Sequence, residues 1–185
     1  SGTFTVQSGG LVNINYSSAS GVANLWAGTE NFMSGSTVNI QNWDSGASAA
    51  DRTLIQNPSK ISANSNGYFF GNLTISSAPS ALFTMVYQNQ TVSLCVNDFT
   101  VSETGSNNVA LTNAASNVTI GGNVIVTAGQ LSFAASNSTA NILTTVLGNI
   151  QPTGGIINLN QTISVNTTSA INLSGNLIIP TGVTL

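Results

Sequence analysis

Residues 97–124, NDFTVSETGSNNVALTNAASNVTIGGNV, contain one full period of a repeat that continues through most of the chain. The period begins at the tripeptide Asn97-Asp98-Phe99 and begins again at Gly122-Asn123-Val124. Related tripeptides start at positions 71, 148 and 175, so that successive starts are separated by 26, 25, 26 and 27 residues. A fixed period of this length is typical of repeat architectures, in which each repeat is one structural unit.

Each period contains three short segments of alternating apolar and polar residues, a pattern that predicts β-strands with one buried face. The segments are joined by Gly, Asn, Ser and Ala, and no helical pattern lies between them. The first set is 73–75, 99–101, 124–126 and 177–179; the second is 82–86, 109–111, 131–133 and 157–159; the third is 92–96, 118–120, 142–146 and 171–173.

Three strands per period predict an all-β fold, a right-handed parallel β-helix in the form of a three-sided solenoid with about 26 residues per coil. Leu73, Phe99, Val124, Ile150 and Leu177 would then form one internal column, with adjacent coils about 4.8 Å apart. An antiparallel sandwich is the alternative, because strands spaced 8 to 12 residues apart also suit that fold.

The Gly-Asn pair at the start of each period predicts a tight corner. We expect the glycine to adopt a positive φ and the asparagines of successive coils to form a ladder of side-chain amides. Asp98 replaces asparagine in one period, and we expect it to interrupt the ladder there.

The chain divides into residues 71–185, the regular coils, and residues 1–70, irregular coils that lose the register. A loop insertion is expected at about 44–67, which contains Pro58 and four of the seven charged residues. Residues 175–185 start a further coil without a polar cap, which predicts a truncated solenoid end. We expect further coils of the same polypeptide, or a secretion or surface protein, to cover that end.

Charged residues make up only 4% of the chain, and the net charge is -3. Two cationic residues are too few for binding to nucleic acid or to an anionic membrane surface. The apolar runs are too short for membrane insertion. Cys95 is the single cysteine and has apolar neighbours, which predicts a buried, unreactive thiol.

The segments 71–77 (GNLTISS), 98–102 (DFTVS) and 117–122 (NVTIGG) resemble the repeat-rich surface proteins of Bacteroidetes-type bacteria. That family is exported by the type IX secretion system and includes long adhesins. The resemblance covers roughly residues 68–185, and the family's C-terminal sorting domain has no counterpart in this sequence. It implies a secreted or cell-surface location and a structural or adhesive role.

Catalysis is not expected, although parallel β-helices often carry polysaccharide-degrading enzymes. Asp44 and Asp51 are carboxylates close together in the sequence, and Arg52 and Lys60 are the only cations. These four residues are interpreted as a solvated loop. The chain has no histidine, so neither a Ser-His pair nor a His-metal site can form, and no cofactor is expected.

The leading hypothesis is therefore a rigid spacer or adhesin shaft. Carbohydrate binding is the alternative, because Trp26, Trp43 and Tyr68 could stack on sugar faces, although such aromatics more often belong to the core. Ice binding is a weaker alternative. It needs a regular outward array of threonines, whereas the outward column of the first strands reads Thr74, Thr100, Ile125, Gln151 and Ile178.

Overall fold

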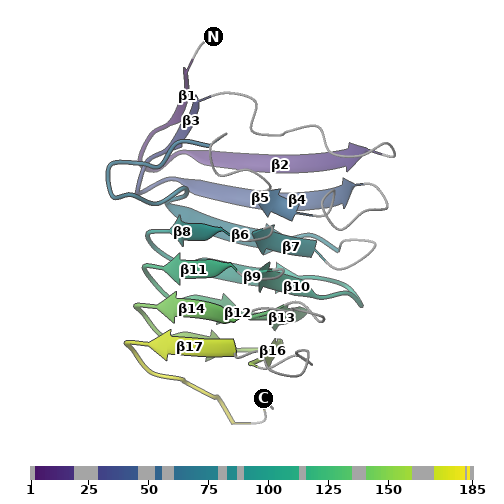
Figure 1. Cartoon of the computed structure of the whole chain (residues 1–185). Coiled ribbons are helices and arrows are strands. Elements are labelled where there is room, and N and C mark those ends of the chain that lie inside the picture. The colour runs from purple at the N-terminus through teal and green to yellow at the C-terminus, as the bar shows by residue number, and fades with distance from the viewer. Residues whose placement is uncertain are drawn as a thin grey trace.

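The computed structural model describes residues 3–18, 29–45, 53–55, 61–78, 83–86, 90–112, 116–134, 141–159, 169–181 and 183. These residues form strands and turns, and they contain no helix. The strands lie in coils that stack from the N-terminal to the C-terminal end (Figure 1). Every pair of described strands is parallel, which confirms the parallel β-helix and rules out the antiparallel sandwich.

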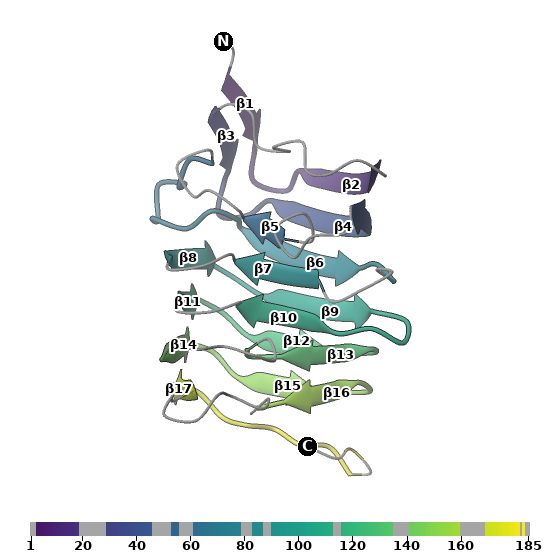
Figure 2. The same cartoon turned by 45° about the vertical axis from the view of Figure 1, so that its right-hand side comes forward.

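Three long sheets form the sides of the solenoid, and each of the four coils from β6 to β17 contributes one strand to each sheet. Figure 2 separates the stack of β8, β11, β14 and β17 from the strands of the other two sheets. The six-stranded sheet has the order β15 (Ile150–Pro152), β12 (Val124–Val126), β9 (Phe99–Glu103), β6 (Asn72–Ser76), β4 (Thr37–Ser45) and β2 (Leu11–Ser18).

The two other long sheets are built in the same way. The five-stranded sheet has the order β16 (Ile156–Asn158), β13 (Gln130–Ser132), β10 (Val109–Thr112), β7 (Phe83–Val86) and β5 (Thr53–Ile55). The four-stranded sheet has the order β17 (Ser169–Leu173), β14 (Ile142–Val146), β11 (Asn117–Ile120) and β8 (Thr91–Cys95). A separate pair joins β1 (Thr3–Val6) to β3 (Thr29–Phe32).

The predicted internal column is confirmed at every position. Leu73 pairs with Phe99, Phe99 with Val124, Val124 with Ile150, and Ile150 with Leu177. The first three residues are fully buried, whereas Leu177 is 38% exposed. Columns in the other sheets line the same core, and the large side chains that are fully buried include Phe32, Phe70, Phe83, Phe133, Ile40, Leu54, Ile75, Met85 and Leu94.

The N-terminal strands keep the spacing that the sequence analysis expected them to lose. Thr3 pairs with Thr29, and Val12 pairs with Val38, which places both pairs 26 residues apart. The 26-residue spacing is broken between β4 and β6, where Val38 pairs with Leu73. The extra chain in that interval includes β5, which joins the five-stranded sheet, and residues 61–70.

Residues 61–70 bridge the coils of β3 and β8 through backbone hydrogen bonds. The amide of Ser62 donates to the carbonyl of Glu30, and the amide of Phe70 donates to the carbonyl of Leu94. Asn64 is buried and holds the turn that follows: its Nδ2 donates to the carbonyl of Phe32, and its Oδ1 accepts from the amides of two later residues. This part of the expected loop insertion is therefore an ordered part of the wall.

The glycines of the Gly-Asn corners have a different role from the one predicted. Among the residues that the structure describes, the positive-φ glycines are Gly9, Gly67, Gly105 and Gly129, and none of them belongs to a Gly-Asn pair. A Cβ added at Gly148 would lie 2.5 Å from the carbonyl carbon of Gly122 in the preceding coil. Glycine is therefore needed because successive backbones approach closely at this corner, not because the chain turns through a left-handed conformation.

A ladder is present at these positions and Asp98 does not interrupt it, but its recurring bonds join side-chain oxygens to backbone amides rather than one side-chain amide to the next. The Oδ1 atoms accept hydrogen bonds from the backbone amides of the next coil: Asn72 from Asp98 at 3.4 Å, Asp98 from Asn123 at 2.9 Å, and Asn149 from Asn176 at 2.8 Å. Asp98 also accepts from the Nδ2 of Asn123. The prediction of an interruption was wrong because the ladder needs a side-chain oxygen at each position, and a carboxylate supplies one.

Candidate functional site

The structure describes two of the three aromatic residues predicted to contact glycans, Trp43 and Tyr68. Trp43 is only 2% exposed, so its ring has no face available to a sugar. It packs instead against Phe83 and Tyr16, with ring centroids 5.3 Å and 5.2 Å away. Tyr68 is half-buried, and Trp26 lies outside the described residues.

The charged residues predicted to form a solvated loop are not described: Asp51, Arg52, Lys60 and the side chain of Asp44 lie outside the described part. Two of the described carboxylates accept hydrogen bonds from backbone amides. Asp98 belongs to the ladder, and Glu103 Oε1 accepts from the amides of Thr104 and Gly105. Within the described ranges, no group of three or more His, Cys, Asp or Glu side chains could hold a metal ion.

Cys95 is fully buried and unpaired, as the sequence predicted. Burial raises the pKa of its thiol far above the ordinary value, and the negative charge of Asp98 raises it further. A thiol that stays protonated is a poor nucleophile and a poor metal ligand. Cys95 is therefore a core residue.

The outer surfaces of the three sheets differ in what they can offer a ligand. All four residues of β7 and all four residues of β10 are buried, so these strands of the five-stranded sheet present no open face. On the six-stranded sheet, several outward side chains bond to one another: Asn39 donates to Asn13, and Ser76 donates to Asn39. The outward column of this sheet also contains Ile125, as the sequence indicated.

The outer face of the four-stranded sheet is more open. We define it by two columns of outward residues: Thr91, Asn117, Leu143 and Ala170, and Ser93, Thr119, Thr145 and Asn172. The hydroxyls of Ser93, Thr119 and Thr145 make no hydrogen bond to another described residue, and none of these outward residues is fully buried. This face therefore presents polar groups that are available to a ligand or to water.

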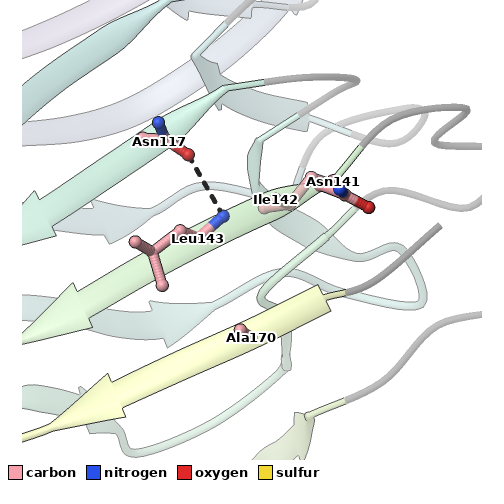
Figure 3. Close-up of a pocket in the computed structure, with 5 residues that line it drawn as sticks. All are labelled: Asn117, Asn141, Ile142, Leu143 and Ala170. Atoms are coloured by element: carbon pink, nitrogen blue, oxygen red, sulfur yellow. Dashed lines mark hydrogen bonds between the residues drawn. The ribbon is translucent and has the colours of Figure 1, made fainter.

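A shallow groove of about 290 Å³ lies on this face. It is lined by Asn117, Asn141, Ile142, Leu143 and Ala170, which come from β11, β14 and β17 and the residue before β14 (Figure 3). The Oδ1 of Asn117 accepts a hydrogen bond of 3.3 Å from the amide of Leu143. The side chain of Leu143 and the methyl group of Ala170 supply apolar surface, and the two asparagines supply polar groups beside it.

Comparison with protein-family models, curated proteins and solved structures finds no match to this chain. These comparisons therefore add no support for the resemblance to type IX secretion cargo. The described strands and turns include no helix long and apolar enough to cross a membrane.

Sequence reasoning placed the candidate site among aromatic residues and did not identify the outer face of the four-stranded sheet. The third predicted strand of each period alternates apolar and polar residues, and the polar residues, such as Thr119 and Thr145, could have indicated this face. The groove itself depends on a small residue, Ala170, standing beside Leu143 in the adjacent strand. That relation becomes visible only when the register is known.

Proposed function

We propose that this chain is a rigid, non-catalytic segment of a secreted or cell-surface protein, where it serves as a spacer or an adhesin shaft. The observation that supports the proposal is the continuity of the sheets. The six-stranded sheet runs from β2 to β15, and hydrogen-bonded neighbours join every coil along it. A solenoid of this kind should resist bending, because the four coils from β6 to β17 contact one another along three sheets.

The composition supports a location outside the cell, as does the resemblance to bacterial surface proteins exported by the type IX system. The chain has 4% charged residues, and its outward strand positions are rich in hydroxyl and amide groups. At the C-terminal end, Ile178 and Ile179 are each 45% exposed. Further coils of the same polypeptide, or a secretion or surface protein, would cover these side chains.

Rigidity can be tested by measuring the distance between two spin labels. The labels would be attached at Gln41→Cys in β4 and Asn172→Cys in β17, both exposed positions, in a Cys95→Ala background. A shaft should give one narrow distance distribution, because the intervening coils are about 4.8 Å apart and cannot hinge. A broad or multimodal distribution in a protein that retains its β-sheet circular dichroism would contradict the proposal.

The non-catalytic part of the proposal has its own test. Purified protein should leave plant, algal and bacterial polysaccharides intact over prolonged incubation. Release of reducing ends or unsaturated products that is abolished by Asp44→Ala or Asp51→Ala would show that the chain is an enzyme.

Carbohydrate binding by Trp26, Trp43 and Tyr68 is weakened as an alternative, because Trp43 is enclosed by the core. A different surface favours the same class of ligand.

A further inference from the structure

We propose that the outer face of the four-stranded sheet binds a neutral polysaccharide, one sugar ring of which occupies the groove over Leu143 and Ala170. This role goes beyond that of a shaft, which requires no ligand. It would make the shaft itself an adhesive surface.

The size of the groove fits a single sugar ring. Its volume of about 290 Å³ lies near the lower end of the range of about 300–1,000 Å³ that is typical of small-molecule sites. The groove is shallow, and its lining residues come from three adjacent strands and the residue before one of them (Figure 3). A polymer can therefore place one ring in the groove while its neighbouring rings continue across the sheet.

The lining has the mixed character that a sugar ring needs. A pyranose has an apolar C–H face and a rim of hydroxyl groups. Leu143 and Ala170 offer apolar surface to the C–H face, and Asn117 and Asn141 lie where the hydroxyl rim would meet them. The Nδ2 of Asn117 makes no hydrogen bond to another described residue and can donate to a sugar oxygen.

The adjacent column extends the polar surface beyond the groove. Thr119, Thr145 and Asn172 occupy matching positions in three successive strands, about 4.8 Å apart. Their hydroxyl and amide groups make no hydrogen bond to other described residues. Several weak contacts to one chain reinforce one another, so a polymer should bind more tightly than a single sugar.

The absence of charge on the four strands decides the class of ligand. β8, β11, β14 and β17 contain no Asp, Glu, Lys or Arg. A nucleic acid or an anionic polysaccharide requires cations to neutralise its charge, and this face has none to offer. An amphipathic helix needs a larger apolar area than the one that Leu143 and Ala170 provide.

The test is a titration of the full ¹⁵N-labelled chain, followed by amide NMR spectroscopy. The probes are the neutral tetrasaccharides cellotetraose, xylotetraose, mannotetraose and laminaritetraose, with tetragalacturonate as the anionic comparison. We expect at least one neutral probe to shift the backbone signals of Leu143 and Ala170 and the side-chain amide of Asn117. Tetragalacturonate should shift none of them.

Two variants examine the groove, and one serves as a matched control. Asn117→Ala removes a donor and should raise the Kd about fivefold, as expected for the loss of one hydrogen bond. Ala170→Glu fills the groove and should raise the Kd at least as much. Gln151→Glu adds the same charge as Ala170→Glu on the outer face of the six-stranded sheet and should leave the Kd unchanged.

Several results would overturn the proposal: no shift with any neutral probe, shifts confined to another face, or equal binding by folded Ala170→Glu. Preferential binding of tetragalacturonate would also refute it. These outcomes leave the distance distribution between the spin labels unaffected, so the shaft role and the binding role can fail separately.

Discussion

Asp98 shows at the scale of one residue what the ladder requires. Its Oδ1 accepts from both the amide and the Nδ2 of Asn123, each at 2.9 Å. Asparagine has the same oxygen, so Asp98→Asn should change the free energy of unfolding by less than about 1 kcal/mol. Asp98→Ala leaves the amide of Asn123 without its acceptor and should cost about 1–3 kcal/mol. Urea denaturation of both variants measures the difference, and equal losses would contradict this role.

Cys95 gives a prediction about pH. Because burial raises the pKa of its thiol, the native state keeps the proton at a pH where the unfolded state loses it. Above roughly pH 8.5, the ordinary pKa of cysteine, this difference should lower the free energy of unfolding by up to about 1.4 kcal/mol per pH unit. Below that pH both states are protonated, and the thiol should have no effect.

The Cys95→Ala variant isolates this contribution, because every other pH-dependent effect on stability is common to both proteins. The stability difference between the parent and Cys95→Ala should shrink as the pH rises from 8 to 10. Parallel stability curves over that range would show that the native thiol ionises as readily as the unfolded one.

At the scale of the strand and its corner, stacking distance determines which residues fit. A Cβ at Gly148 would lie 2.5 Å from backbone atoms of Gly122, whereas a Cβ at Gly67 would meet nothing within 4 Å. Gly67 has a φ of 81°, a conformation that asparagine tolerates. Gly67→Asn should therefore cost less than about 1 kcal/mol, from backbone strain alone, and Gly148→Asn should cost about 1–3 kcal/mol through steric overlap. Thermal or urea unfolding of the pair distinguishes close approach from backbone conformation as the reason for glycine.

The strands of residues 71–177 could be predicted because alternation agrees with a recurring tripeptide, which is Gly-Asn-X in every coil except the one that starts at Asn97. The N-terminal coils lack that tripeptide, because Leu11 and Thr37 occupy the positions that align with Asn72. Their 26-residue spacing therefore became apparent only from the strand pairing. Trp43 was assigned to a binding site because a sequence does not show which aromatic ring the core encloses. The groove beside Ala170 could not be predicted, since it results from side-chain sizes in adjacent strands.

For the whole molecule, the 26-residue period implies that coils are interchangeable units. Residues 123–148 contain β12, β13 and β14 and end at the corner glycine, so a second copy inserted after Gly148 would place its own strands in all three sheets. In such an array, stability is approximately the sum of coil and interface contributions. The lengthened protein should therefore fold with a free energy of unfolding at least equal to that of the parent.

The inserted coil should also lengthen the molecule by one interstrand spacing. The distance between spin labels at Gln41→Cys and Asn172→Cys should increase by up to about 4.8 Å, because the labels lie on opposite sides of the insertion along the stack but on different sheets. Duplication of residues 123–142 instead adds a segment that is out of register, which would turn apolar side chains outward, and that protein should be unstable or degraded. An unchanged label distance in the 26-residue duplication would mean that the extra coil loops out, and the stack would then not be a modular shaft.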